Sequence, residues 1–435
     1  MTVTAEPRTG GQPAPARRGR WRDWCLSTPV LVIVGAASLA YVIRWTVLTY
    51  LTAPRQFLDL SVYRLGVQAW WHGQNMYGVL PPDSQGNHLP FLYPPFAAAL
   101  FTPFALLSWH QVIGGMLLLS LLSLLVTIYL TAMRIWPDGG VRGTILVTAV
   151  TLPLSLKAEP VWDTIWYGQI NLVLMALVAL DCLTPHPKWP RGLLIGIAAA
   201  VKLTPAVFIL FFLLRKDFRT SVTIVISGAV ATGIGFLTSW QGSMSYWFGS
   251  NSALHGVSGT GFIGNQSIDG ALGRWGLPHH TQKELWLAAV AVVGVASILA
   301  IIKAHRRDNA PLAMVITAMF GLVASPTSWG HYWIYAVPAI MVMVAVAIQR
   351  QHIGWLIAAI AASLVVAIPP FFYVAQGGTI MTLKQQVKAN AYTVASLILL
   401  AAFLLPSGLR WLRRHWSASR SGTDGTPLTA SNSAA

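Results

Sequence analysis

The sequence is poor in charge and in cysteine. Only 10% of its 435 residues are charged, whereas soluble domains carry roughly 25%, so a soluble globular protein is excluded. Its two cysteines, Cys25 and Cys182, lie far apart, which excludes a disulfide framework and a zinc site. An internal repeat is missing, which counts against an inverted-repeat transporter. A glycine-rich nucleotide-binding fingerprint is also missing.

What is abundant is apolar sequence. Hydrophobic residues make up 55% of the chain and mean hydropathy is +0.59. With about 20 residues needed to cross a bilayer, the apolar segments predict an all-α polytopic membrane protein with about twelve transmembrane helices. Residues 29–406 form this membrane domain. Some segments are short or broken, and the side of the membrane reached by residues 134–168 is left open.

The two ends of the chain and two internal stretches are polar. Residues 1–28 and 407–435 are basic and are expected to be disordered cytoplasmic tails. The first apolar segment, Pro29–Leu51, is too long for a cleaved signal peptide and is read as a signal anchor. Residues 53–93 and 240–284 are expected to be long outer loops.

The distribution of Lys and Arg supports this orientation. The expected outer loops, 53–93, 240–284 and a shorter one at 375–390, hold 6 of these residues, whereas the expected inner segments hold 16, as the positive-inside rule requires. These inner segments are 1–28, 215–219, 303–307, Arg350 and 407–435. The net charge of +16 would indicate nucleic-acid binding in a soluble protein. Here it follows from topology and from attraction to anionic membrane lipids, so no nucleic-acid partner is expected.

Asp59 stands out in the first outer stretch. The chain has only 13 acidic residues, and a carboxylate held against the mouth of a membrane bundle is costly to desolvate, which indicates a function. A solvated loop acid remains the alternative. Asp83 is the only other carboxylate between residues 53 and 93.

Lys202 lies inside an apolar segment, 13 residues before Arg215 at its expected cytoplasmic end. At 1.5 Å per residue, the ammonium group lies roughly 20 Å from the inner surface. It therefore needs an anionic partner or a polar cavity. Pro205 predicts a broken helix beside it, as found where a helix lines a cavity. A structural partner, Asp163 or Asp181, and a phosphate ligand are both open.

Other polar groups are expected on the same face. His331 lies in a turn with Trp329 and Tyr332, although an interfacial histidine can also be a member of an aromatic belt. Two amides, Gln169 and Asn171, open another helix. The glycine-rich stretch 255–267 can offer backbone N–H groups to an anion, or it can be a flexible loop.

This combination of groups fits sugar chemistry. A carboxylate can remove a proton from a sugar hydroxyl, cations can stabilise a phosphate leaving group, and aromatic rings and amides suit sugar rings. Nucleotide sugars are not available outside the cell, so a lipid-linked phosphosugar is the expected donor.

The motifs also occur in a known order. The chain resembles the GT-C glycosyltransferases of family eighty-seven, in particular the mycobacterial and corynebacterial polyprenyl-phosphate-mannose-dependent α-(1→2)-mannosyltransferases. The resemblance covers roughly residues 30–405. The stretches that carry it are Leu58–Tyr63 (LDLSVY), Leu92–Phe96 (LYPPF), Tyr167–Asn171 (YGQIN), Lys202–Pro205 (KLTP), Asn265–Ser267 (NQS) and Ser325–His331 (SPTSWGH).

The resemblance implies a GT-C fold and an inverting transfer at the outer face of the plasma membrane. Mannose would pass from polyprenyl-phosphate-mannose to the 2-hydroxyl of a mannosyl glycolipid, a phosphatidylinositol mannoside. Asp59 would be the general base, and Lys202, His331 and Arg274 would lie near the donor phosphate. The residues expected to bind the sugar or the acceptor are Tyr63, Tyr93, Gln169, Asn171, Asn265, Gln266, Trp329 and Tyr332.

No cofactor is expected. Many GT-C relatives carry two neighbouring acids in the first loop and some use a divalent metal, but Asp59 has no adjacent acid, and a hard cation needs at least two oxygen ligands. Three alternatives stay open. The same fold can use a lipomannan acceptor or an arabinosyl donor. The chain can be a glycolipid transporter. It can also be a scaffolding protein, in which Asp59 and Lys202 would be replaceable.

Overall fold

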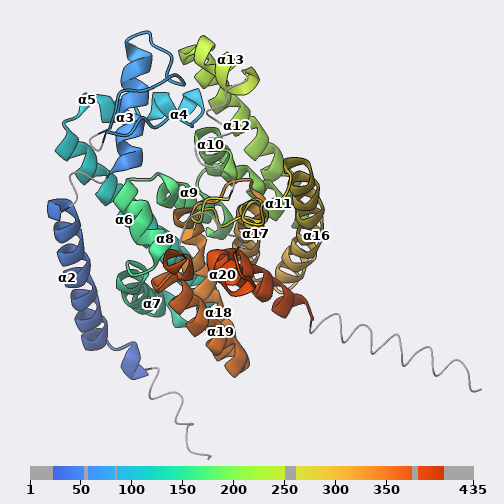
Figure 1. The fold of residues 1–435 in the computed structure, drawn as a ribbon. Coiled ribbons are helices and arrows are strands. Elements are labelled where there is room, and N and C mark those ends of the chain that lie inside the picture. Colours follow the sequence, from blue (N-terminus) through green and yellow to red (C-terminus); the bar gives the residue numbers. More distant parts are fainter. Residues whose placement is uncertain (1–22, 53–56, 84–85, 250–260, 375–380, 406–435) are drawn as a thin grey trace, which may run out of the picture.

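The computed structural model describes residues 23–52, 57–83, 86–249, 261–374 and 381–405, and this part of the chain is helical (Figure 1). The helices before Lys202 are α2 (Thr28–Thr52), α3 (Leu58–Trp71), α4 (Pro95–Leu100), α5 (Thr102–Leu106), α6 (Trp109–Ile135), η1 (Pro137–Gly139), α7 (Gly140–Ser155), α8 (Glu159–Tyr167), α9 (Asn171–Leu183) and α10 (Leu193–Val201). Those after it are η2 (Thr204–Phe208), α11 (Ile209–Leu214), α12 (Phe218–Thr238), α13 (Trp240–Phe248), α15 (Ile268–Gly273), α16 (His279–His305), α17 (Ala310–Ala324), η3 (Gly330–Tyr335), α18 (Ala336–Arg350), α19 (Ile353–Ala367), η4 (Pro370–Tyr373), α20 (Leu383–Ala389) and a helix over Ala391–Leu405.

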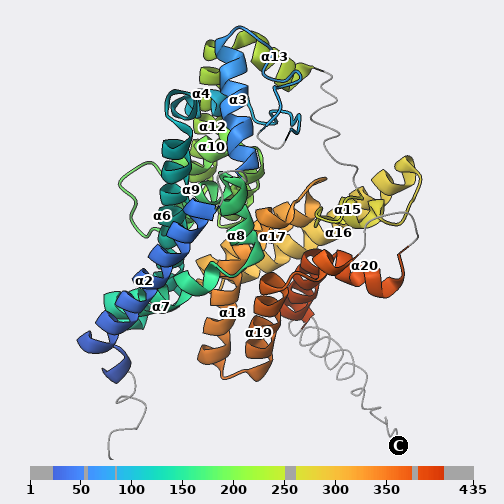
Figure 2. The same ribbon diagram turned by 60° about the vertical axis from the view of Figure 1, so that its left-hand side comes forward.

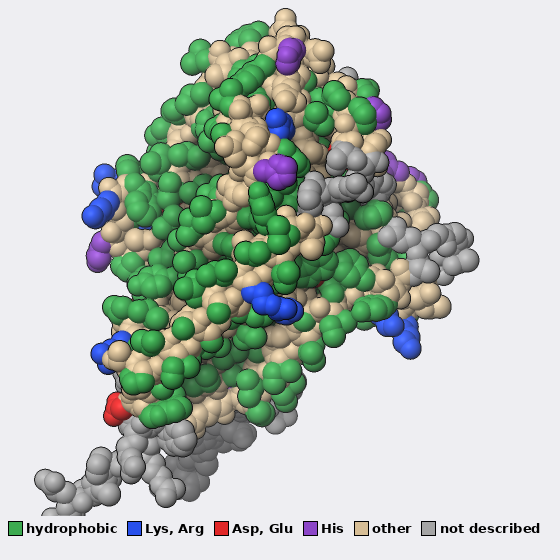
Figure 3. Space-filling model, turned by 90° about the vertical axis from the view of Figure 1, so that its left-hand side faces the viewer, with side chains coloured by type: hydrophobic (Ala, Val, Ile, Leu, Met, Phe, Trp, Pro, Cys, Tyr) green, Lys and Arg blue, Asp and Glu red, His purple; other side chains and the backbone are tan. Residues whose placement is uncertain are grey.

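Several of these helices can cross a membrane. By length and composition 5 helices qualify within the described residues, or up to 7 if each bent pair counts as one span. Four shorter apolar helices accompany them, so the expected twelve spans are not confirmed. Apolar side chains cover much of the face in Figure 3. The first span, α2, packs on α7 and leaves Val32, Ile33 and Leu39 exposed, as expected of a surface that faces lipid.

Both expected outer loops contain helices, which corrects the sequence prediction. In the first, α3 forms because Leu60, Tyr63 and Val67 recur at helical spacing and are all buried. In the second, α13 and α15 occupy part of the stretch, and α16 begins at His279. Much of the glycine-rich segment lies at 250–260, outside the described residues. In Figure 2, α3, α4 and α13 lie at one end of the molecule and α18 and α19 at the other.

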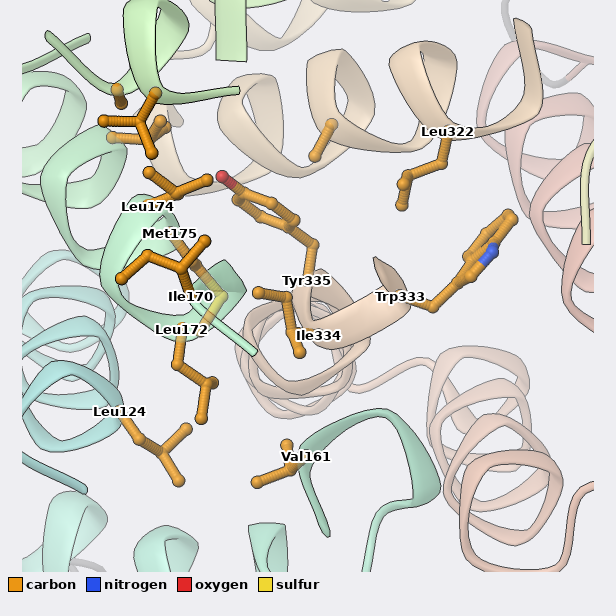
Figure 4. Close-up of a cluster of buried hydrophobic side chains, with 14 of the residues drawn as sticks. Leu124, Val161, Ile170, Leu172, Leu174, Met175, Leu322, Trp333, Ile334 and Tyr335 are labelled. Carbon is orange, nitrogen blue, oxygen red and sulfur yellow. The ribbon is translucent and has the colours of Figure 1, made fainter. Parts of the chain in front are cut away.

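The core near the centre of the molecule is built on short elements. Figure 4 shows Trp333, Ile334 and Tyr335 of η3 among apolar side chains such as Leu174 and Leu322. These belong to α9 and α17, and α8 packs on η3 from another side. The buried side chains hold η3 firmly, so the residues at its start are positioned by the core.

Candidate active site

Asp59 lies in the first turn of α3, where a carboxylate is favoured by the helix dipole. Leu60, the next residue, and Phe57, just before the helix, are buried, and Asp59 itself is half-buried. Burial raises the pKa of the Asp59 carboxyl above its usual value, and the side chains of His331, Gln169 and Lys202 act against this rise. These three residues come from three distant stretches, so the structure brings them together around Asp59.

Gln169 is held in one orientation by two tyrosines. The hydroxyls of Tyr63 and Tyr93 both donate to Gln169 Oε1 at 2.9 Å, and they lie 2.9 Å from each other. With its oxygen so occupied, the amide presents its N–H side to Asp59, with which Gln169 forms a side-chain hydrogen bond. Both tyrosines are buried, and their hydroxyls orient Gln169 from inside the protein.

The residue before Gln169 is a glycine with a left-handed backbone conformation. Gly168 ends α8 with φ +67° and ψ +35°, a conformation that favours glycine. A Cβ at Gly168 would lie 2.7 Å from the Cβ of Leu60 and 3.1 Å from Phe57. The missing side chain therefore allows the end of α8 to touch the start of α3, which places Gln169 beside Asp59.

Lys202 lies at the predicted helix break. The α10 helix ends at Val201, Lys202 is extended, and the chain resumes as the 3-10 helix η2 around Pro205. The ammonium Nζ donates to Asn171 Oδ1 at 2.9 Å and lies 3.5 Å from the centre of the Tyr332 ring, a cation–π contact. Among the described residues no carboxylate lies within salt-bridge distance of it.

Neither structural partner considered for Lys202 is used. The Asp181 carboxylate accepts from Trp189 Nε1 at 2.8 Å and from the Ile195 N–H at 2.9 Å, while Asp163 faces His331. The polar contact of Lys202 is therefore with Asn171 and not with either of these carboxylates.

His331 is buried and has one ring nitrogen free. Its Nδ1 lies 3.5 Å from Asp163 Oδ2, and its backbone carbonyl accepts from the Thr164 hydroxyl at 2.8 Å. Its Nε2 is buried without a hydrogen-bond partner in the described structure, and so is Asn171 Nδ2. Leaving a buried polar group unpaired costs about 1–3 kcal/mol, so both atoms mark positions that a polar ligand can fill.

A pocket adjoins this cluster. Its polar lining includes Asn171, Thr204 and Tyr332, and the remainder is mostly apolar, with Phe208 and Leu322 among the lining residues. A ligand with a polar head and an apolar tail matches this division. The Lys202 contacts with Asn171 and Tyr332 lie at the polar end.

Four other predicted site residues form a separate structural cluster. The amides of Asn265 and Gln266 bond to the backbone of Pro326, Ser328 and Ala389, and Asn265 pairs with Trp329 in a β-bridge. The guanidinium of Arg274 donates to the Phe262 and Asn265 carbonyls at 2.8 and 2.9 Å and to the side chain of Asn390. These contacts fasten residues 261–267 to the strand-like backbone before His331, and the structure does not bring them to Asp59.

The sequence reading missed Glu159. This carboxyl is 1% exposed and lies one helical turn before Asp163. The spacing of two acids at i and i+4 on one helix face was visible in the sequence, and in a chain with 13 acidic residues it was a usable signal.

Comparison with known proteins gives the family. The sequence profile described as "Glycosyltransferase family 87" matches residues 91–326. No solved structure matches the chain.

Curated relatives cover most of the chain. The polyprenol-phosphate-mannose-dependent alpha-(1-2)-phosphatidylinositol mannoside mannosyltransferase of Mycobacterium tuberculosis is 35% identical over 365 residues, which is 81% of this chain and 82% of that protein. The protein of the same name in Mycolicibacterium smegmatis is 38% identical over 329 residues, 72% of this chain and 74% of the relative. The corresponding pentamannoside mannosyltransferase of Mycobacterium tuberculosis is 32% identical over 341 residues, 76% of this chain and 75% of the relative. On these grounds the chain belongs to glycosyltransferase family 87.

Proposed function

We propose that this protein transfers mannose from polyprenyl-phosphate-mannose to the 2-hydroxyl of a phosphatidylinositol mannoside, with inversion at the anomeric carbon. The observation that carries the proposal is the meeting of Asp59 with Gln169, Lys202 and His331 from four distant stretches. The names of the relatives, which describe this donor and this acceptor class, support it.

Asp59 acts as the general base. Its carboxylate takes the proton of the acceptor 2-hydroxyl, the acceptor oxygen bonds to C1 of mannose, and the bond from C1 to the phosphate oxygen breaks. General-base catalysis contributes about 10²–10⁴-fold. The Gln169 amide, fixed by Tyr63 and Tyr93, orients the carboxylate for this step.

Lys202, His331 and Asn171 receive the phosphate. The leaving phosphate gains negative charge as the C1–O bond breaks, and fixed donors stabilise this charge. Lys202 has no carboxylate partner among the described residues, and His331 Nε2 and Asn171 Nδ2 are buried without partners. The first units of the polyprenyl chain lie against the apolar lining of the adjoining pocket, which includes Phe208 and Leu322. Arg274 has its contacts elsewhere and stabilises the neighbouring loop.

Transfer takes place at the outer face of the plasma membrane, with both termini in the cytoplasm. The excess of Lys and Arg in the expected inner segments supports this orientation. No metal takes part in the proposed mechanism, because Lys202 supplies the positive charge beside the leaving group.

The test uses membranes from cells that produce the wild type, Asp59→Asn or Asp83→Asn at equal protein levels. Each receives radiolabelled polyprenyl-phosphate-mannose and a phosphatidylinositol mannoside. We expect a longer, α-mannosidase-sensitive glycolipid from the wild type and from Asp83→Asn, and a loss of about 10²-fold or more from Asp59→Asn. Asp83 is the matched control because it lies in the same stretch of the chain and its carboxylate accepts from the backbone and side-chain N–H groups of Asn87.

Equal labelling by Asp59→Asn would remove Asp59 as the base. Labelling of lipomannan in preference to the phosphatidylinositol mannoside, or from an arabinosyl donor, would reassign the substrates on the same fold. A glycolipid transporter would instead move the glycolipid across protein-containing liposomes that hold no donor.

A further inference from the structure

Glu159 is a buried carboxyl that the proposed reaction does not use. It is 1% exposed, and its Oε2 accepts a hydrogen bond from the Tyr392 hydroxyl at 2.6 Å. Burying a carboxyl so completely is costly unless its charge is removed or balanced. No Lys or Arg lies within salt-bridge distance of it in the described residues, so the balance must come from elsewhere.

A second carboxyl lies on the same face of α8. Asp163 follows Glu159 by four residues, and side chains at this spacing are neighbours on a helix. Glu159 therefore borders the space that the Asp163 side chain occupies.

Asp163 connects this pair to the candidate site. Its Oδ2 faces His331 Nδ1 at 3.5 Å, and the opposite ring nitrogen, Nε2, is the atom without a partner. A carboxylate opposite Nδ1 keeps the proton on that nitrogen and fixes the plane of the ring, as it does for metal-bound histidines.

The backbone of the histidine loop also rests on Glu159. A Cβ at Gly330 would lie 2.5 Å from Glu159 Oε1 and 3.2 Å from Phe371. Glycine before His331 thus allows the loop to lie directly on the Glu159 carboxyl. The next residue of α8 after Asp163, Thr164, holds the His331 carbonyl at 2.8 Å. The helix α8 therefore contacts both the backbone and the ring of His331.

We propose that Glu159 is a positioning residue for His331. Its carboxyl lies against Gly330 and beside Asp163 on α8, and so keeps the loop and the ring of His331 in place with Nε2 directed toward the donor phosphate. This inference rests on the proposed function, in which His331 contacts that phosphate. Glu159 itself touches neither substrate.

The test measures donor and acceptor kinetics for Glu159→Gln and Glu159→Ala in the full-length membrane protein. Glu159→Gln keeps the volume of the side chain that lies against Gly330 and can still accept from Tyr392, so we expect donor kcat/KM within about threefold of the wild type. Glu159→Ala removes this side chain, and we expect donor kcat/KM to fall about tenfold or more, with the acceptor KM unchanged. Equal thermal stability of the two variants would show that the difference does not arise from unfolding.

A double-mutant cycle decides whether Glu159 acts through His331. We expect Glu159→Ala to cost nothing further in a His331→Gln background, because the ring it positions is gone. The matched control is Asp181→Asn, another fully buried carboxyl whose contacts are with Trp189 and Ile195. The fold-losses in donor kcat/KM caused by Asp181→Asn and by His331→Gln should multiply in the double variant.

Two results would overturn the inference while leaving the proposed function in place. One is full additivity of Glu159→Ala with an impaired His331→Gln variant. The other is a folded Glu159→Gln variant with donor kcat/KM reduced about tenfold or more, which remains decisive even if Glu159→Ala does not fold. By contrast, a His331→Gln variant as active as the wild type would refute the proposed phosphate role of His331, and the inference with it.

Discussion

Gly168→Ala tests whether the contact between α8 and α3 builds the candidate site. Gly168 has φ +67°, and an added Cβ would lie 2.7 Å from the Cβ of Leu60. Cβ atoms do not approach so closely, and a Cβ, unlike the tip of a side chain, cannot rotate away. The end of α8 or the start of α3 must therefore shift, and these segments carry Gln169 and Asp59.

The structure contains a control that separates the two costs of this substitution. Gly73 has nearly the same φ, +69°, but a Cβ there would meet nothing within 4 Å. Gly73→Ala should therefore cost only the left-handed conformation, about 1 kcal/mol. Gly168→Ala should add about 1–3 kcal/mol for forcing extra volume into packed surroundings, so its total cost is about 2–4 kcal/mol.

Thermal unfolding of the purified protein in detergent and transferase activity at a temperature where both variants are folded give the two measurements. We expect Gly168→Ala to melt below Gly73→Ala. We also expect Gly168→Ala alone to lose about tenfold or more of its activity, because small displacements of catalytic groups cost up to about 10²-fold. If the two variants melt together and transfer equally fast, the contact with Leu60 does not position the site, and the reasoning is refuted.

Three further predictions concern the chemistry. Lys202→Met should lower donor kcat/KM by about 10²-fold and leave the acceptor KM unchanged. As a control, Lys384→Met, at an exposed lysine, should match the wild type. An effect on the acceptor KM alone would contradict the proposed contact of Lys202 with the phosphate. Asp59 must be deprotonated to act as the base, and burial raises its pKa. As pH is lowered, kcat/KM should therefore begin to fall at a pH above the usual carboxyl pKa of about 3.9. A kcat/KM that stays constant down to that pH would contradict the role of Asp59 as base. Treatment with EDTA should leave transfer intact, and a loss restored by a divalent cation would show a metal requirement.

The membrane character and the main members of the cluster could be predicted from sequence. Asp59, Lys202 and His331 are polar groups in apolar surroundings, which is costly without a function, and the structure places all three together. The break at Lys202 followed from Pro205, whose ring cannot continue a helix, and it is present.

What sequence could not supply is the direction of each polar side chain. Tyr93 and Asn265 look alike in a motif, but Tyr93 bonds to Gln169 beside the carboxylate, whereas Asn265 bonds to Pro326 and Ser328 in a different cluster. These partners lie 61 to 76 residues away in the chain, and local periodicity carries no information on such contacts. The helix α3 could have been predicted from the helical spacing of Leu60, Tyr63 and Val67, but not the packing of its Gly66 against Phe91.

The residues of the cluster lie where α-helices begin, end or are interrupted. Asp59 is in the first turn of α3, Gln169 follows the left-handed end of α8, Lys202 follows α10, and His331 lies in the 3-10 helix η3. A regular helix satisfies its own backbone and turns its side chains outward around a cylinder, so four separate helices cannot easily aim four polar groups at one point. Interrupted helices can, because each chain direction changes at the break. The cost is unpaired backbone at membrane depth, which is tolerated only where protein or a cavity surrounds it. Hydrogen bonds from α8 pair such backbone groups, as where the Thr164 hydroxyl donates to the His331 carbonyl. The same contacts also position the site.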